Sequence, residues 1–435
     1  MTIDWVWWLQ VGFIGYFTLL NGGYLLLNWL SMVSLRHTMR QRAELGEAAP
    51  YLGMEPAVSV LVPAYNEAAT IRTSIRSLLQ LQYPDYEVVV INDGSRDDTL
   101  AVLQQEFELV LHPEPLRLEV PHQAIRGVYR SLRYSHLRVV DKANGGKADA
   151  LNAGINAARH GLFCAVDADS ILQRDSLLRV VQPFLEDERT VAAGGTVRIA
   201  NGSQVRGGFL VKAGLPYNLL ARFQIVEYLR AFLFGRLGWS PMNAVLIISG
   251  AFGLFDRERV MDVGGYRTDT VGEDMELVVR LHRYHRQRRM PYRIRYLPDP
   301  ICWTEAPEDL GTLGRQRSRW QRGLAESLSR HARLALNPRG GPPGHLAWPF
   351  MTLFEWLGPL VELVGYAFMI GGFLLGQVSY TALVVFLLVA IGMGILLSVN
   401  GLLLETLSFR VYTRRRDILV LFVMAILENF GYRQL

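Results

Sequence analysis

The first part of the chain alternates between short apolar runs and segments in which apolar residues recur at helical spacing. The short runs predict strands over residues 58–62, 86–91, 137–140 and 162–166. The helical spacing predicts helices over residues 68–79, from about residue 97, over 147–158 and near 175–185. Strands that are apolar throughout and alternate with helices indicate an α/β domain with a parallel sheet covered on both faces.

Other hydrophobic stretches are long and almost free of charge. Three of them, residues 5–33, 347–375 and 379–405, reach the roughly 20 residues that a membrane-spanning helix needs. Residues 418–435 are marginal, and because this stretch stops abruptly at Leu435 we expect the natural chain to run on. The first stretch is too long for a signal-peptide core and lacks a basic start, so we expect a retained anchor.

These patterns divide the chain into three parts. We expect an N-terminal transmembrane helix over residues 1–35, a cytosolic domain over 54–336 and C-terminal transmembrane helices over 346–435. Within the cytosolic domain, residues 215–240 and 313–336 suit amphipathic helices at the membrane interface. For 215–240 an ordinary buried helix fits equally well. Residues 109–133 look like a loop-rich insertion, and the glycines and prolines of 337–344 indicate a turn.

Composition and charge support a membrane protein. Half of the residues are hydrophobic and 20% are charged, which is more apolar than a soluble enzyme of this size usually is. The net charge of +5 indicates no nucleic-acid partner, because the basic residues lie beside the apolar stretches. These clusters are Arg36, Arg40 and Arg42; Arg330, Arg333 and Arg339; and Arg410 and Arg414 to Arg416.

The positive-inside rule places all three basic clusters in the cytoplasm. Counting membrane crossings gives the same topology, with the turn at residues 376–379 outside. We therefore expect a multi-pass protein of the cell (inner or plasma) membrane, in contact with the bilayer and with its large domain in the cytoplasm. Cys164 and Cys302 have no metal-ligand spacing, and we expect two buried thiols.

Two carboxylates follow the strand predicted at 162–166. Asp167 and Asp169 are two residues apart, so strand alternation would point both side chains to the same side. Mg²⁺ prefers such oxygen ligands and usually keeps substrate phosphates as co-ligands. The pair therefore indicates metal-assisted chemistry on a diphosphate, although Asp-x-Asp also occurs in ordinary turns.

Other polar clusters follow the remaining predicted strands, at residues 63–67, 92–95 and 141–147. Ligands of parallel α/β sheets bind at the carboxyl ends of the strands, where all these clusters would meet. The last cluster contains Asn144-Gly145-Gly146-Lys147, which is not a Walker loop because the spacing and the trailing Ser or Thr are absent.

Two further motifs lie beyond the sheet signals. Gly272-Glu273-Asp274 opens an apolar helical segment, where acidic residues would also serve as helix caps. The second motif, QRSRW at residues 316–320, lies in a basic stretch expected to be helical. Its alternative interpretation is a solvated face beside anionic lipid.

Taken in order, these motifs resemble the membrane-embedded, inverting family-two glycosyltransferases. The chain is most similar to processive members, the poly-N-acetylglucosamine, hyaluronan, chitin and cellulose synthases. The resemblance runs from PAYNE at residue 63 to Trp320 and includes the flanking membrane helices. It implies the A-type nucleotide-sugar fold, a Rossmann-like α/β cytosolic domain, attached to an α-helical transmembrane bundle.

The resemblance also assigns residues to the nucleotide-sugar site. Pro63, Tyr65 and Glu67 would border the uridine pocket. Asp93 would accept hydrogen bonds from uracil or ribose, and Lys147 would lie near the nucleotide.

The same resemblance assigns the chemistry. Asp167 would contact the nucleotide and share the metal site with Asp169, which would hold Mg²⁺ or Mn²⁺ against the diphosphate. Asp274 would be the general base, with Glu273 beside it. Gly272 stands where many relatives carry threonine, which puts a threonine contact near the acceptor in doubt. The acceptor and diphosphate end would be lined by Gln316, Arg319 and Trp320.

The implied function is processive elongation of a β-linked polysaccharide from a UDP-sugar, UDP-N-acetylglucosamine above all, with passage of the growing glycan across the membrane. Direct attack by an acceptor hydroxyl would invert the anomeric centre. An accessory export subunit is a possible partner. Two alternatives stay open: transfer of one sugar to a lipid acceptor, and a non-catalytic component that binds nucleotide sugar or polymer for a partner synthase.

Overall fold

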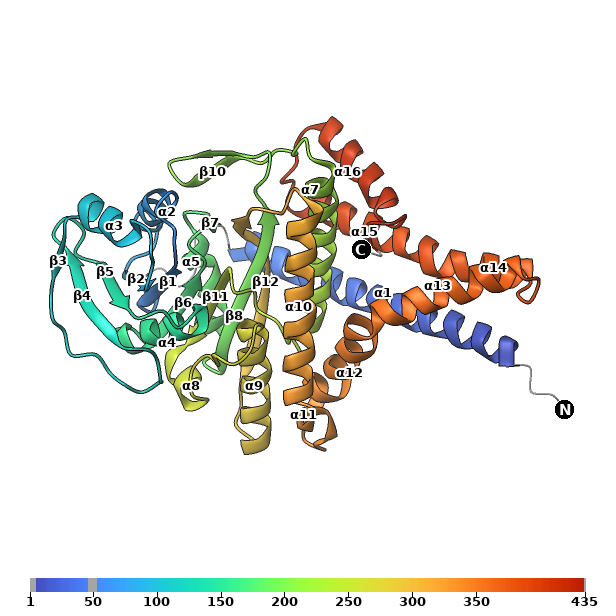
Figure 1. The fold of residues 1–435 in the computed structure, drawn as a ribbon, viewed down its shortest axis with the longest axis horizontal. Coiled ribbons are helices and arrows are strands. Elements are labelled where there is room, and N and C mark those ends of the chain that lie inside the picture. The colour runs from blue at the N-terminus through green and yellow to red at the C-terminus, as the bar shows by residue number, and fades with distance from the viewer. Residues whose placement is uncertain (1–4, 46–52, 434–435) are drawn as a thin grey trace.

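A ten-stranded sheet is the largest sheet of the protein in the computed structural model, which describes residues 5–45 and 53–433. The strand order is β3-β4-β5-β2-β1-β6-β11-β8-β12-β7. Figure 1 shows the sheet with its helices on one side of the molecule and α1, α13 and α14 extending from the other. The four predicted strands are β1 (Val58–Ala64), β2 (Tyr86–Asp93), β5 (Leu137–Lys142) and β6 (Leu162–Val166).

Those four strands are parallel neighbours, and nearly all of their side chains are buried. The predicted helices follow them, with bounds shifted by a few residues. They are α2 (Ile71–Leu78), α3 (Thr99–Phe107), α4 (Lys147–Ala157), α5 (Ser176–Val180) and α6 (Gln182–Glu186). The α/β prediction for this half is confirmed.

The expectation of a purely parallel sheet is wrong, because the sheet is mixed. Strand β4 (Ile125–Ser131) runs antiparallel to β5, and β11 (Phe252–Asp256) runs antiparallel to both β6 and β8 (Thr190–Ile199). Strand β12 (Arg293–Thr304) then pairs with β8 in parallel.

Residues 109–133 are likewise more ordered than a loop-rich insertion. They contain β3 (Leu109–Leu111) and β4, which complete one edge of the sheet. Strand β3 is the edge strand and β4 is its neighbour, and both leave many side chains exposed or half-exposed, so neither has the continuous apolar run that reveals a central strand. Three short strands lie elsewhere: β7 (Ile171–Leu172), β9 (Gln204–Arg206) and β10 (Phe209–Lys212).

The segment expected at 215–240 is helical and largely buried. It comprises α7 (Leu219–Tyr228), the π-helical η1 (Leu229–Arg236) and a short turn of 3₁₀ helix, η2 (Leu237–Trp239). Its apolar side chains join the main core, and η1 contacts β8, α1 (Trp5–Leu45) and α15 (Met393–Ser408). The segment therefore fills the space between the sheet and the apolar helices.

From residue 257 onward, the described chain is mainly helical apart from β12. Helix α8 (Arg257–Asp262) and α9 (Glu273–Arg288) flank the end of the sheet, and α10 (Leu310–Arg330) with α11 (Arg333–Leu336) covers the basic stretch expected to be helical. The remaining helices are η3 (Pro343–Ala347), α12 (Trp348–Phe350), η4 (Met351–Trp356), α13 (Gly358–Leu374), α14 (Tyr380–Leu387), η5 (Leu388–Gly392) and α16 (Arg415–Leu427).

Among the described residues, one helix is long and apolar enough to cross a membrane, Tyr380–Ser408. A second candidate is the pair Pro343–Trp356 and Gly358–Leu374, which is bent by 49°. Helix α1 is continuous over 41 residues but does not meet the same hydropathy test, and α16 has 13 residues. The predicted spans at 5–33 and 418–435 stay predictions.

Candidate functional site

The polar clusters predicted at the strand ends do meet at the carboxyl edge of β1, β2, β5 and β6. Strand β6 ends at Val166, so Asp167 and Asp169 lie in a turn, in which the Ser170 amide donates to the Asp167 carbonyl at 3.0 Å. The turn, rather than strand alternation, brings the two carboxylates together. Partial burial and the charge of Asp167 raise the pKa of Asp169, with a smaller contribution from Glu67.

Lys147, the first residue of α4, joins this turn to the start of α9. Its ammonium pairs with the Asp167 carboxylate, lies 3.9 Å from Glu273 and donates to the Gly250 carbonyl at 3.4 Å. Loss of contact with water alone would lower the pKa of Lys147. The carboxylates of Asp167 and Glu273 outweigh that effect and raise the pKa to about 12, so the lysine stays charged.

Asp274 and Glu273 form the first turn of α9 beside this lysine. The Gly250 amide donates to Asp274 Oδ2 at 3.0 Å, and the Met275 amide donates to Oδ1 at 2.8 Å. Burial and the charge of Asp274 raise the pKa of Glu273 to about 6. Asp167, Lys147, Glu273 and Asp274 are therefore one connected cluster, and their roles stay predictions.

Asp93 lies next to this cluster but is already fully engaged. Its carboxylate is about 4% exposed and accepts hydrogen bonds from the Gly145 and Gly146 amides at 3.0 and 2.7 Å. The buried Lys142 ammonium lies 2.5 Å away. In this structure Asp93 orders the glycine loop that precedes Lys147, and its contact with uracil or ribose stays a prediction.

The Pro63–Glu67 loop follows β1 at the same edge. The Asn66 amide donates to Ser95 Oγ at 3.0 Å, and the Glu67 amide donates to Thr99 Oγ1 at 2.8 Å, so the loop is tied to the end of β2. The Tyr65 side chain is about 43% exposed, and Pro63 is half-buried. This placement is compatible with the predicted uridine pocket, which stays a prediction.

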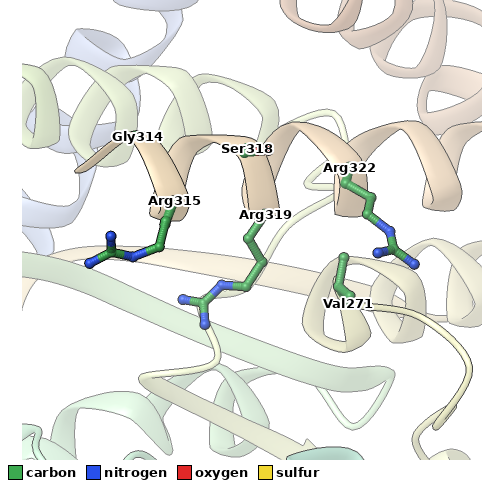
Figure 2. A pocket seen from close by; sticks show the side chains of 6 residues that line it. All are labelled: Val271, Gly314, Arg315, Ser318, Arg319 and Arg322. Carbon is green, nitrogen blue, oxygen red and sulfur yellow. The ribbon is translucent and has the colours of Figure 1, made fainter. Parts of the chain in front are cut away.

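Arg319 lines a cavity of about 440 Å³ between α10 and the residues just before α9. Figure 2 shows Arg315, Arg319 and Arg322 projecting from the same side of α10, with Val271 beside Arg322. Val271 directly precedes Gly272-Glu273-Asp274, so the arginines lie close to the acidic motif in the fold. A diphosphate is the kind of group that such guanidinium groups stabilise.

The other two residues of the Gln-x-x-Arg-Trp motif lie along the same helix. The Oε1 atom of Gln316 is buried, and within residues 5–45 and 53–433 it has no hydrogen-bond partner. The Trp320 ring is half exposed, lies 6.4 Å from the Tyr228 ring and has the Arg317 guanidinium 5.0 Å from its centre. Contact of Gln316 and Trp320 with an acceptor stays a prediction.

The glycine that replaces the usual threonine has a structural reason. Gly272 packs directly against Gly323 of α10, and a Cβ atom on Gly272 would lie 2.8 Å from the Gly323 Cα atom. A Cβ atom on Gly323 would lie 2.9 Å from the Gly272 Cα atom. The space that a threonine side chain would occupy is filled by the backbone of α10.

Asp167 and Asp169 fit a divalent cation that also binds a ligand. Within the described ranges no group of three or more His, Cys, Asp or Glu side chains is arranged to hold a metal ion. Two carboxylates with substrate phosphates as further ligands are the usual arrangement for Mg²⁺. Burial and then repulsion by Asp167 raise the pKa of Asp169, and a cation between the two carboxylates would relieve this repulsion.

Comparison with known proteins identifies the family. The model of glycosyl transferase family 2 matches residues 59–208, and that of glycosyl transferase family group 2 matches residues 162–397, more than half of the chain. The chain belongs to glycosyl transferase family group 2. This assignment confirms the predicted resemblance to family-two glycosyltransferases.

Curated members of the family resemble this chain at about 30% identity. The poly-beta-1,6-N-acetyl-D-glucosamine synthase of Staphylococcus epidermidis is 30% identical over 274 residues, and that of Staphylococcus aureus strain COL is 32% identical over 276 residues. Each match covers 63% of this chain and 56% of the relative, so the chain spans little more than half the length of these synthases.

A solved structure confirms the nucleotide-sugar glycosyltransferase fold. The mannosyltransferase PcManGT from Pyrobaculum calidifontis, solved with GDP-Man and Mn²⁺, superposes with a TM-score of 0.55 at 20% identity. The superposition covers 97% of this chain and 99% of that structure.

Two features of this candidate site were missed by sequence reasoning. Lys142 bridges Asp93 and Asp149, with its ammonium 2.5 Å from a carboxylate oxygen of each. The sequence did indicate a partner for Lys142, because a lysine at the end of an apolar strand must find a counter-charge. The Gly250 peptide, which contacts both Lys147 and Asp274, had no signal, because only the fold brings it there.

Proposed function

We propose that this chain is a processive, inverting glycosyltransferase that elongates a β-linked polysaccharide from a UDP-sugar. The observation that carries the proposal is the cluster of Asp167, Lys147, Glu273 and Asp274 beside the cavity lined by Arg319. The names of the curated relatives support N-acetylglucosamine as the sugar.

The donor site would use the loops at the carboxyl edge of the sheet. Pro63, Tyr65 and Glu67 would border the uridine, and the loop ordered by Asp93 would pass beneath the diphosphate. Asp167 and Asp169 would hold Mg²⁺ or Mn²⁺, and a bound cation would compensate the charge of the leaving diphosphate. Lys147 and Arg319 are protein cations that would also compensate the charge of the leaving diphosphate.

Asp274 would remove the proton from the acceptor hydroxyl. Its position is fixed from two sides by the Gly250 and Met275 amides, which leaves the carboxylate little freedom to turn away. Once deprotonated, the hydroxyl oxygen attacks the anomeric carbon as the bond to the diphosphate breaks, so an α-linked donor gives a β-linked product. Gln316 and Trp320 would contact the acceptor sugars.

The helices outside the sheet would form a multi-pass membrane bundle. Phe17 of α1, Met369 of α13 and Phe386 of α14 are buried against one another in a cluster separate from the main core. Large apolar side chains elsewhere on these helices are exposed, as lipid-facing residues would be. With the sheet domain in the cytoplasm, the growing glycan would leave through this bundle, alone or with an accessory export subunit.

Membranes containing the full chain, incubated with a panel of radiolabelled UDP-sugars and Mn²⁺, test the proposal. We expect a ladder of products with one UDP-sugar and none with Asp274→Asn. The matched control is Glu188→Gln, which removes an exposed carboxylate outside the site. A single lipid-mobile product would instead indicate one-sugar transfer, and UDP binding without any transfer would indicate a non-catalytic component.

A further inference from the structure

A second cavity, of about 730 Å³, lies at the far end of α9 from the acidic motif. Glu273 and Asp274 open this helix, and His285 and Arg286 lie in its last turn. At 1.5 Å per residue, Asp274 and Arg286 are about 18 Å apart along the helix. The other walls come from the start of β12, the residues before β8, and the turn at 338–341.

Arginine dominates the walls of this cavity. Five line it: Arg189, Arg286, Arg289, Arg293 and Arg339. The carboxylate of Asp187 lies 2.7 Å from Arg189 and 3.9 Å from Arg293, so one acid serves two arginines. The side chains of Arg289 and Arg339 are exposed and pair with no carboxylate among the residues that the structure describes.

Stabilisation of a helix end does not account for this convergence. Cations favour the C-terminus of a helix, which explains Arg286 and Arg289 at the end of α9. Arg189, Arg293 and Arg339 come from three other segments of the chain and meet at the same place. Asp187 compensates Arg189 and Arg293, and the positive charge of Arg289 and Arg339 is left available to an anionic ligand.

The turn that carries Arg339 is built to close over the cavity. Gly341 has a backbone φ of +59°, and a Cβ atom there would lie 2.7 Å from the Arg286 Cζ atom. Only glycine therefore lets this turn pass directly across the Arg286 guanidinium, which donates to the Tyr292 hydroxyl at 3.2 Å. Arg286 and Arg339, which come from distant segments of the chain, therefore both line this cavity.

His285 supplies a polar atom on the inner wall. The residue is about 1% exposed, its ring stacks on Tyr292 with centroids 4.8 Å apart, and Nδ1 bonds to the Leu281 carbonyl at 2.8 Å. Burial lowers the pKa of His285, so the ring is neutral and Nε2 carries the lone pair. Within the described part of the chain Nε2 has no partner and is covered by its neighbours, so it would accept from a ligand hydroxyl after a small movement of the side chains around it.

We propose that this cavity binds a phosphate ester that carries a hydroxyl group, with the phosphate against Arg289 and Arg339 and the hydroxyl at His285 Nε2. The bent helix pair that is a candidate membrane span begins at Pro343, two residues after Gly341. A phosphoglycerol lipid headgroup and a soluble phosphate ester share the required chemistry. This site is separate from the proposed donor site.

The test compares two double variants of the full-length protein. R289Q/R339Q removes the two unpaired cavity arginines. R288Q/R333Q is the matched control, because both of its arginines are exposed, lie close in sequence to the first pair and do not line the cavity. Equal thermal unfolding midpoints verify that both variants fold. A ligand that bound at the donor site instead would bind both variants with the same affinity.

Two measurements distinguish the sources of phosphate. Native mass spectrometry counts the phosphatidylglycerol molecules retained from bilayers of phosphatidylcholine and phosphatidylglycerol, and calorimetry measures binding of glycerol 3-phosphate in detergent. Loss of a retained lipid in R289Q/R339Q alone supports a headgroup. An affinity for glycerol 3-phosphate at least tenfold weaker in that variant, with lipid retention unchanged, supports a soluble ligand.

Equal behaviour of the two variants in both measurements would overturn the proposal. If R289Q/R339Q does not fold, Arg339→Gln alone carries the test against Arg333→Gln, because both side chains are exposed. In that case we expect about a threefold loss of affinity or a measurable loss of retained lipid, and equality would again overturn the proposal.

Discussion

Lys147 organises the candidate site at the scale of single residues. One ammonium group contacts Asp167, approaches Glu273 and bonds to the Gly250 peptide that in turn holds Asp274. Without such a cation, three carboxylates could not approach so closely, because like charges in a partly buried site repel each other strongly. The lysine thus links the proposed metal-binding turn to the proposed base.

The proposed division of roles gives different outcomes at two carboxylates. We expect Asp274→Asn to lower transfer by roughly 10²–10⁴-fold, the usual contribution of a positioned base, with UDP affinity nearly unchanged. Asp169→Asn should also weaken UDP binding, but only in the presence of Mn²⁺. Turnover assays and calorimetry with UDP measure the two effects, and near-normal turnover of Asp274→Asn would show that another group is the base.

The ionised side chain of Glu273 should destabilise the folded protein at neutral pH. Its pKa is raised from 4.5 to about 6, so its ionised form is disfavoured in the folded protein. Stability is then lost as the pH rises from about 4.5 through 6, and Glu273→Gln avoids that loss. We expect the variant to be more stable at pH 7 by up to about 2 kcal/mol, with no difference near pH 4.5.

Thermal unfolding of both proteins across this pH range measures the effect. Glu188→Gln, at an exposed position, is the control and should follow the wild-type protein at each pH. A destabilised Glu273→Gln variant at pH 7 would mean that the pairing with Lys147 outweighs the burial of the carboxyl group.

The motif residues of the site could be predicted because strand ends in a parallel sheet share one edge. Asp167 and Lys147 were predicted to lie together on that basis and do so in the structure, whereas Asp274, in the first turn of α9, was assigned to the site only by the family resemblance. What sequence could not supply were contacts made by peptide groups and paired charges. The Gly250 peptide and the full engagement of Asp93 depend on the path of distant loops.

At the scale of elements, the contact between α9 and α10 sets the distance from the acidic motif to Arg319. Gly272 and Gly323 bring the two backbones within van der Waals distance. A threonine at position 272 would collide with α10 in its present position. The glycine at 272 is therefore what allows α10 to pack this closely. The helices are therefore held together where the proposed chemistry takes place.

A methyl group at this contact should separate the helices. We expect Gly323→Ala to lower turnover at least tenfold while UDP affinity changes less than twofold, because the displacement moves Arg319 relative to Asp274. Gly371→Ala in α13 is the control, since nothing lies within 4 Å of a Cβ atom there. Steady-state kinetics and UDP titration measure both, and unchanged turnover would show that α10 tolerates the shift.

The central strands were predictable and the outer ones were not, for a reason that lies in burial. Val58–Ala64 and Leu162–Val166 are buried on both faces and read as continuous apolar runs. Ile125–Ser131 is mostly half-exposed and contains Gly127 and two arginines, so it resembled a loop. Strand direction carries no local signal, which is why the antiparallel β11 was not anticipated.

At the scale of the whole molecule, the expected membrane topology can be tested by labelling introduced cysteines, with little background from native ones. Both native cysteines, Cys164 and Cys302, are buried and free. We expect a cysteine at Gln377 to react with an impermeant maleimide added outside intact cells, and a cysteine at Arg415 to react only after permeabilisation. Glu188→Cys, on the sheet domain, is the cytoplasmic control, and labelling of Glu188→Cys in intact cells would invert the proposed orientation.

One ion pair limits how far the molecule can be divided. Arg198 of β8 is about 3% exposed and pairs with Glu405 of α15, which is about 2% exposed. A shortened chain that ends before α13 would leave this arginine without its counter-charge, a loss that typically costs 3–5 kcal/mol. The sheet domain and the apolar helix α15 therefore depend on each other to fold, and neither half is expected to survive purification by itself.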